Sequence, residues 1–168
     1  MNTPTDFEKR IVLRKAKGED KQAIVRISHS TVNFVVEEDW LDGLVKENPH
    51  TVIVAVHGSL VVGFLIYVVR DDGVYVTHMA VEETLRRNGI GSALMGKVIN
   101  DLQDHGKNNI NMVVDCSDAQ CLQFCKAMGF RSVGVLNNYY ERGKSAQMLR
   151  FDKSAVHLGL SCSFAVSR

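Results

Sequence analysis

The stretch LRRNGIGSAL, residues 85–94, places two arginines and two spaced glycines directly before an apolar helical pattern. Because apolar residues recur at Ile90, Leu94 and Val98, we expect a helix to begin near Gly89. The first N–H groups of a helix lack intrahelical acceptors and carry partial positive charge, and glycine lets an anion approach the backbone closely. The stretch therefore predicts an anion cradle, with a simple helix-opening turn as the alternative.

The residues on both sides of this stretch alternate between strand and helix patterns. Runs rich in β-branched residues predict strands, and apolar residues at helical spacing predict helices. We expect strands at residues 10–16, 51–56, 60–69, 74–81, 111–115, 130–136 and 145–151, and helices around 23–27, 35–45, 90–105 and 118–128, the last capped by Gly129. This order is typical of a mixed α/β sheet with antiparallel hairpins.

The composition narrows the class of protein. A chain of 168 residues is long enough for one domain with a substantial core. The formal net charge of +1 gives no basic surface for nucleic acid, and the longest apolar run, residues 60–69, is too short to cross a bilayer. The first nine residues lack the apolar core of a secretion signal, so we expect a cytoplasmic protein.

Four cysteines, Cys116, Cys121, Cys125 and Cys162, allow two disulfides, a metal site or reduced thiols. Cys121 and Cys125 are four residues apart in an expected helix, and no CxxC pair or partner histidine accompanies them. We therefore expect reduced thiols that pack as small apolar side chains, and no metal.

Two motifs together resemble those of a known family. The pattern R-x-x-G-x-G at residues 86–91, after the strand VYVTHMAV, resembles the acetyl-CoA signature of the GNAT superfamily of N-acetyltransferases, and SDAQCLQFCKAMGFRSVG is similar to its second cofactor segment. The resemblance covers residues 10–151. It implies the GNAT fold: a mixed, mostly antiparallel seven-stranded sheet, splayed between strands 4 and 5 and flanked by about four helices. Residues 1–9 are then a flexible N-terminus and residues 152–168 an irregular tail.

The resemblance also implies acetyl-CoA as the acetyl donor and places it along the chain. The pyrophosphate would lie on the turn, whose residues are Arg86, Arg87, Asn88, Gly89, Ile90, Gly91 and Ser92. The pantetheine arm would pair with the backbone near Met79 and Val81, and the N–H of Met79 or Ala80 would face the thioester carbonyl. Asp118 stands where many relatives carry an asparagine that bonds the pantetheine.

The resemblance gives three candidates for proton transfer. Cys125 stands where many relatives carry a tyrosine that protonates the leaving thiolate; the alternative is a packed apolar residue. Tyr75 is the first candidate for the base, holding a water in line rather than acting as a free base. His78 is its competitor because histidine titrates near neutrality. A reaction with no dedicated base is a further alternative.

The acceptor is expected to be a primary amine. The run of residues 137–143, with Tyr139 and Tyr140, resembles the hairpin of protein N-terminal acetyltransferases, including the ribosomal-protein-alanine type, whose tyrosines wall the peptide channel. One departure is Ser145 before an alanine, where those relatives usually have aspartate. The carboxylates of Glu37 and Glu38 would attract a cationic amine.

A protein N-terminal α-amine is therefore the expected acceptor. A small amine such as a polyamine, amino acid or amino sugar is the alternative within enzymes, and a non-catalytic acetyl-CoA-binding module is the alternative outside them. The expected assembly is a monomer or a homodimer, with no membrane partner.

Overall fold

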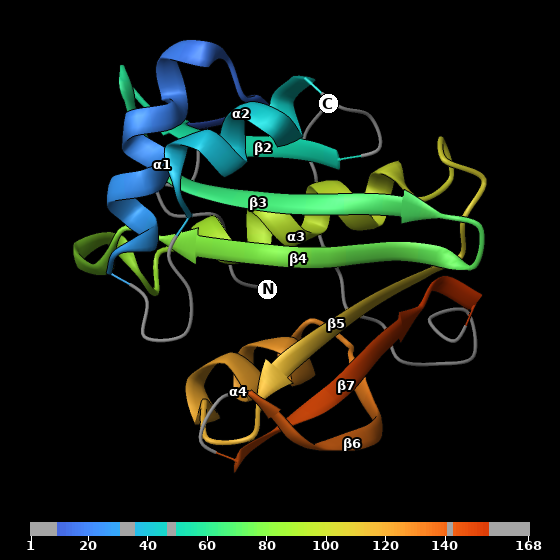
Figure 1. Cartoon of the computed structure of the whole chain (residues 1–168). Helices are drawn as coiled ribbons and strands as arrows, with labels where there is room; N and C mark the ends of the chain where they lie inside the picture. Colours follow the sequence, from blue (N-terminus) through green and yellow to red (C-terminus); the bar gives the residue numbers. More distant parts are fainter. Residues whose placement is uncertain (1–9, 31–35, 47–49, 141–142, 155–168) are drawn as a thin grey trace. The chain divides into compact units, whose positions relative to one another are not determined.

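A computed structural model describes residues 10–30, 36–46, 50–140 and 143–154, and its elements follow the expected order (Figure 1). The strands are β1 (Ile11–Lys15), β2 (His50–His57), β3 (Leu60–Arg70), β4 (Gly73–Val81), β5 (Asn109–Asp115), β6 (Arg131–Tyr140) and β7 (Lys144–Asp152). The helices are α1 (Lys21–Ser28), α2 (Glu38–Lys46), α3 (Ile90–Asp101) and α4 (Ala119–Ala127), with short 3₁₀ turns η2 (Gly18–Asp20) and η3 (Glu83–Leu85).

The seven strands form one sheet in the order β1-β2-β3-β4-β5-β7-β6. Neighbouring strands run antiparallel except β4 and β5, which pair in parallel with Val74 opposite Ile110 and Tyr75 opposite Asn111. This arrangement confirms the mixed α/β fold expected from the order of elements. By its internal contacts the chain divides into unit 1, Met1–Val69 and Val76–Val98, and unit 2, Arg70–Tyr75 and Ile99–Arg168.

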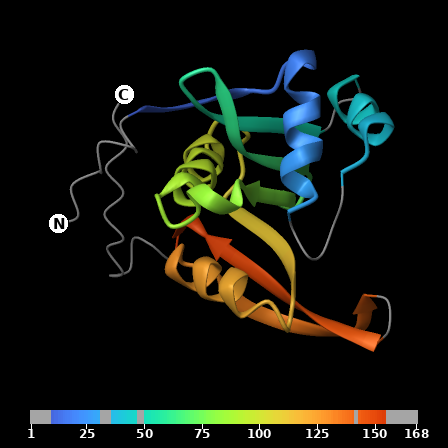
Figure 2. The ribbon, with the colours of Figure 1, turned by 90° about the vertical axis from the view of Figure 1, so that its left-hand side faces the viewer.

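Unit 1 buries apolar side chains on both faces of its strands. Helices α1 and α2 lie on one side of β2, β3 and β4, and α3 lies on the other (Figures 1 and 2). The core on the α1 and α2 side contains Ile24, Ile27, Leu41, Val52, Val54, Phe64, Ile66 and Ala80. On the α3 side, a Cβ atom at Gly63 would lie 3.2 Å from a methyl carbon of Ile90. Glycine at this point of β3 therefore allows the close approach of α3.

In unit 2, helix α4 packs against the strands through buried sulfur and aromatic side chains. The Sγ atom of Cys125 lies 3.6 Å from the Sδ atom of Met112 on β5. The rings of Phe130 and Phe151 have their centroids 5.7 Å apart. The helix ends as predicted, because Gly129 follows it in the left-handed region with φ of 91°.

Several element boundaries differ from those predicted, including those of β6, β5 and α3. Strand β6 was expected to end at residue 136 but continues to Tyr140, with a register shift after Leu136. Asn138, with φ of 52°, bends the strand instead of ending it, so the asparagines that signal a turn mark a bulge. Strand β5 begins two residues early at Asn109, opposite Asp152, and helix α3 ends at Asp101 before a series of turns.

Some expectations fall outside the described residues, namely the flexible N-terminus at residues 1–9 and the tail beyond residue 154. Strand β7 itself extends to Asp152, the first residue assigned to that tail. Cys116, Cys121 and Cys125 are free thiols, as expected. Among the described residues there is no acid, histidine or cysteine cluster that could hold a metal, and no helix long and apolar enough to span a membrane.

Candidate active site

The turn between β4 and α3 has the backbone geometry of an anion site. Arg87 and Gly89 both adopt left-handed conformations, with φ of 67° and 77°, while Asn88 between them does not. Such alternation turns successive N–H groups toward one side and forms an anion-binding concavity. The side-chain amide of Asn88 donates to the backbone oxygens of Leu85, at 3.1 Å, and Arg86, at 3.2 Å, and so fixes the turn.

Helix α3 begins directly behind this concavity. Its first i to i−4 hydrogen bond runs from the N–H of Ala93 to the carbonyl of Gly89 at 2.9 Å. The N–H groups of Ile90, Gly91 and Ser92 therefore precede the hydrogen-bonded ladder, where helix geometry supplies no acceptor and the helix dipole favours negative charge. The prediction that the helix begins after Gly89 is confirmed, and a phosphate fits the chemistry of its first turn.

The two arginines of the turn differ in their surroundings. Arg86 donates from Nε to the backbone oxygen of Val81 at 3.2 Å, and from Nη2 to that of Ser30 at 3.3 Å. It therefore ties the turn to the end of α1. Arg87 is exposed and holds a left-handed conformation that costs a non-glycine residue of the order of 1 kcal/mol or more. Strain of this kind concentrates at functional sites.

His78, on β4, is held by a threonine and a tryptophan of unit 1. Its Nδ1 atom lies 3.1 Å from Oγ1 of Thr77. The indole of Trp40, on α2, meets the imidazole edge-on, with ring centroids 4.8 Å apart and planes at 62°. Burial, and then the charge of His50, lower the pKa of His78 below its usual range. The ring is therefore neutral near pH 7 and able to accept a proton.

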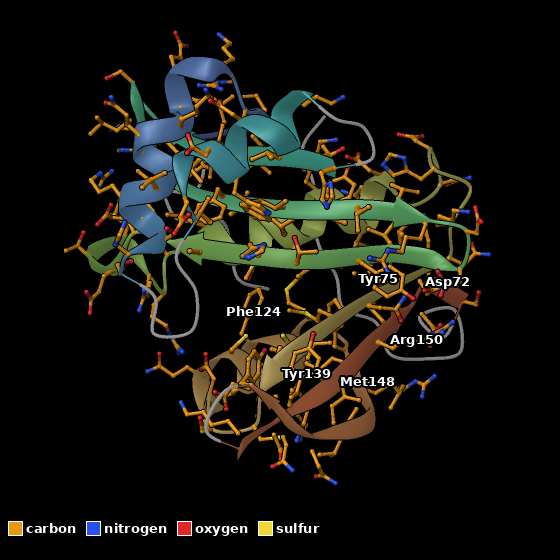
Figure 3. The ribbon with its side chains drawn as sticks, in the orientation of Figure 1. Asp72, Tyr75, Phe124, Tyr139, Met148 and Arg150 are labelled. Atoms are coloured by element: carbon orange, nitrogen blue, oxygen red, sulfur yellow. The ribbon has the colours of Figure 1, made fainter. Side chains whose placement is uncertain are left out.

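Tyr75, at the start of β4, donates its hydroxyl to Oδ2 of Asp72 at 2.5 Å, and Figure 3 shows the two side chains together. The guanidinium of Arg70 lies 4.9 Å from the centroid of the tyrosine ring. The bond to Asp72, and then burial, raise the pKa of Tyr75. A hydroxyl with a raised pKa and a carboxylate partner is a weak proton acceptor, so this geometry disfavours Tyr75 as the base.

Cys125, on α4, is fully buried. The hydrogen bond to Cys121, and then burial, raise the pKa of the Cys125 thiol, while the bond lowers the pKa of Cys121. The sulfur of Met112 is a second acceptor for the Cys125 thiol, which donates to only one of the two at a time. These surroundings favour the interpretation of Cys125 as a packed residue over that of a proton donor.

Asp118 caps helix α4. Its Oδ1 atom accepts from the N–H of Cys121 at 2.9 Å, and its side chain is half-buried. One carboxylate oxygen therefore satisfies the helix N-terminus, as N-cap aspartates do. A contact from Asp118 to pantetheine stays a prediction.

The two tyrosines of the expected acceptor channel lie at the end of β6 in unit 2. The rings of Tyr139 and Tyr140 meet edge-on with centroids 5.0 Å apart, and Tyr139 is the more exposed of the two (Figure 3 labels Tyr139). Burial, and then Tyr139 and Asp115, raise the pKa of Tyr140, which is therefore a neutral hydrogen-bonding group near pH 7. Their role as channel walls stays a prediction.

The acidic segment before and within α2 is only partly described. Glu37 and Asp39 are exposed, whereas the side chain of Glu38 falls outside the described part of the chain. Trp40, next in sequence, is 41% exposed although it contacts His78. Exposed carboxylates and an indole face near the histidine suit a cationic acceptor.

The predicted site residues divide between the two units. Unit 1 holds the predicted anion turn, Met79, Ala80, Val81 and His78, whereas unit 2 holds Tyr75, Asp118, Cys125, Tyr139 and Tyr140. The sequence singled out neither Thr77 nor the contact between Trp40 and His78. A threonine beside a histidine on a strand follows no recognisable pattern. The pairing of α2 with β4 is a tertiary contact, which local periodicity does not report.

Comparisons with known proteins identify the family and the fold of this chain. The profile of the acetyltransferase (GNAT) family matches residues 17–130. An N-alpha-acetyltransferase from Sulfurisphaera tokodaii is 30% identical over 76 residues, which are 45% of this chain. That match spans less than half, 46%, of the relative's own length.

Solved structures share the fold at low identity. Ard1 from Thermoplasma volcanium has a TM-score of 0.79 at 23% identity, covering 85% of this chain and 97% of its own. The ribosomal-protein-alanine N-acetyltransferase from Escherichia coli has a TM-score of 0.76 at 20% identity, covering 84% and 93%. NAA60 from Arabidopsis thaliana, solved with acetyl-CoA, has a TM-score of 0.74 at 18% identity, covering 86% and 99%. The family profile matches most of this chain, and the solved structures share its fold over most of its length. The chain therefore belongs to the acetyltransferase (GNAT) family.

Proposed function

We propose that this acetyltransferase transfers the acetyl group of acetyl-CoA directly to a primary amine, and that the acceptor is the α-amine of a protein N-terminus. The observation that supports acetyl-CoA as the donor is the backbone of the turn before α3. Arg87 and Gly89 adopt left-handed conformations there, and the first N–H groups of the helix follow. This backbone suits a pyrophosphate, which needs several N–H donors and close approach.

The donor supplies an activated thioester, and residues of unit 1 would stabilise the oxyanion and accept the proton. Met79 or Ala80, next to His78 on β4, would donate a backbone N–H to the oxyanion that develops on the carbonyl oxygen. The nitrogen of the acceptor amine would bond to the carbonyl carbon of the acetyl group as the carbon–sulfur bond of the thioester breaks. The coenzyme A thiolate would take its proton from solvent.

His78 is the proton acceptor in this proposal. A protonated amine has no lone pair, so a base must remove a proton before or during attack. The lowered pKa keeps His78 neutral near pH 7, whereas the raised pKa and the Asp72 bond of Tyr75 oppose that role. Assigning the proton to His78 reverses the order of the two candidates given by the sequence.

The choice of a protein N-terminus rests on three supports. Tyr139 and Tyr140 occur in the run that resembles the peptide channel of N-terminal acetyltransferases. The Sulfurisphaera tokodaii relative is named an N-alpha-acetyltransferase, and the Escherichia coli structure acts on the alanine of a ribosomal protein. Tyr139 is exposed and carries a hydroxyl able to bond a peptide backbone.

A polyamine is the second candidate acceptor, and one observation favours it. Glu37 and Asp39 are exposed beside Trp40, whose indole is 41% exposed. Carboxylates and an aromatic face attract any cationic amine.

The donor site is tested by the substitution Gly89→Glu, read by coenzyme A thiol release. A carboxylate in the turn repels phosphate, and a side chain at φ of 77° strains the backbone, so we expect the KM for acetyl-CoA to rise by about tenfold or more. Gly96→Glu is the matched control, because a Cβ at Gly96, within α3, meets no atom within 4 Å. Equal KM values in the two folded variants would remove the turn from the donor site.

A further inference from the structure

We propose that Thr77 is a positioning residue, whose hydroxyl fixes His78 in the tautomer that carries its proton on Nδ1 and its lone pair on Nε2. The mechanistic value of this tautomer rests on the proposed function, in which His78 accepts the proton of the amine. The tautomer itself does not depend on that function, and it is measured separately.

The hydroxyl of Thr77 makes two contacts, one with β3 and one with the imidazole of His78. Thr77 Oγ1 lies 3.2 Å from the backbone oxygen of Ile66 on β3 and 3.1 Å from Nδ1 of His78. A carbonyl oxygen only accepts, so the hydroxyl proton of Thr77 must point toward Ile66 for the first bond to form.

The direction of the second bond then follows from the proton count. Thr77 has one hydroxyl proton, and once that proton is given to Ile66, its oxygen can only accept from His78. Nδ1 of His78 must therefore carry the hydrogen for both bonds to exist together. In a neutral imidazole the other nitrogen, Nε2, then carries the lone pair.

The contact with Trp40 defines the plane of the same ring. The indole meets the imidazole at 62° with centroids 4.8 Å apart, a geometry that aromatic rings favour. One bond at Nδ1 and one ring contact together restrict rotation of the histidine about its side-chain torsions. Thr77 thus sets which nitrogen accepts, and Trp40 limits where that nitrogen points.

The neutral state that this tautomer requires is consistent with the surroundings of His78. Burial lowers its pKa, and the nearby positive charge of His50 on β2 lowers it further. Thr77 itself is exposed, so a substitution there leaves the buried core of unit 1 intact.

The test compares Thr77→Val with Thr77→Ser by NMR of the ¹⁵N-labelled imidazole at neutral pH. Valine keeps the branched shape that suits a strand but has no hydroxyl, whereas serine keeps the hydroxyl. We expect the wild type and Thr77→Ser to show the Nδ1–H tautomer, and Thr77→Val to lose it. A wild-type His78 protonated on Nε2, or an unchanged tautomer in Thr77→Val, overturns the proposal.

Kinetics then measure what the tautomer does. Thr77→Val should lower kcat about 3- to 10-fold, as loss of one hydrogen bond would, with the KM for acetyl-CoA unchanged. Thr77→Ser should keep at least about half of the wild-type kcat, because serine retains the hydroxyl that makes the hydrogen bond. An unchanged kcat with a changed tautomer would contradict the positioning role. A wild type without turnover on any amine would instead contradict the proposed function and leave the NMR result standing.

Discussion

His78 is the residue whose chemistry the account depends on most. Its pKa is lowered by burial and by His50, so the neutral form that accepts a proton predominates above the lowered value. As pH falls through that value, the ring becomes protonated and loses its lone pair. We therefore expect kcat to fall in acid, with an apparent pKa below 6.5.

Substitution of His78 or His50 tests whether the fall of activity in acid, the acidic limb of the pH profile, comes from the titration of His78. His78→Gln should lower kcat by about 100-fold or more, the usual contribution of a positioned base, and abolish the limb. His50→Gln should keep the activity but move the limb to higher pH, because it removes the charge that opposes protonation of His78. A limb that persists in His78→Gln would assign the titration to another group.

Substitution of Cys125, in contrast to that of His78, is expected to change kcat little. The thiol is fully buried, and its raised pKa makes it a poor proton donor. Cys125→Ala should therefore leave kcat within about twofold of wild type, since a true general acid contributes about 100-fold or more. A loss of that larger size, in a variant that keeps its fold by circular dichroism, would make Cys125 the donor.

Single residues also show where sequence reasoning reached its limit. The β-rich run at residues 74–81 placed Tyr75 and His78 on a strand correctly, because strand patterns are local. It did not reveal that Asp72 accepts the hydroxyl of Tyr75, or that Trp40 contacts His78. Those partners decide which group accepts a proton, and they depend on turn geometry and tertiary packing.

Among the elements, helix α3 begins at the proposed donor site and packs closely against one glycine of β3. A Cβ on Gly63 would lie 3.2 Å from the backbone oxygen of Ala80, 3.2 Å from Ile90 and 3.4 Å from Leu94. Gly63→Ala should therefore displace the first turn of α3, cost about 1–3 kcal/mol of unfolding free energy and raise the KM for acetyl-CoA.

The same type of substitution within helix α3 provides the control. Gly96→Ala meets no atom within 4 Å, and alanine favours helix over glycine by up to about 1 kcal/mol. It should leave the KM unchanged and raise the melting temperature slightly. If Gly63→Ala behaves in the same way in thermal unfolding and kinetics, the packing of α3 on β3 does not set the donor site.

At the level of elements, the sequence predicted the order of strands and helices and the start of α3. Glycines and periodic apolar residues mark those features locally. It predicted the end of β6 wrongly, because Asn138 is as compatible with a bulge inside a strand as with a turn. Pairing with β7 decides between the two, and pairing is not local.

At the scale of the whole chain, the sequence marks the proposed donor site clearly and the proposed acceptor residues weakly. The turn in unit 1 and the family profile agree on the chemistry of acetyl transfer. Tyr139 and Tyr140 support the proposal of a protein N-terminus, and the exposed carboxylates of Glu37 and Asp39 separately favour a polyamine. In the proposed function, donor recognition uses backbone N–H groups, whereas acceptor recognition uses individual side chains.

The most direct test of the account is acetyl transfer to matched acceptors, followed by coenzyme A thiol release and mass spectrometry. The acceptors are a peptide with a free α-amine, the same peptide with its N-terminus blocked and one internal lysine, and spermidine. The account predicts a single acetyl group on the α-amine, with kcat/KM exceeding the other two by about tenfold or more. Turnover confined to spermidine or to the lysine peptide would contradict it.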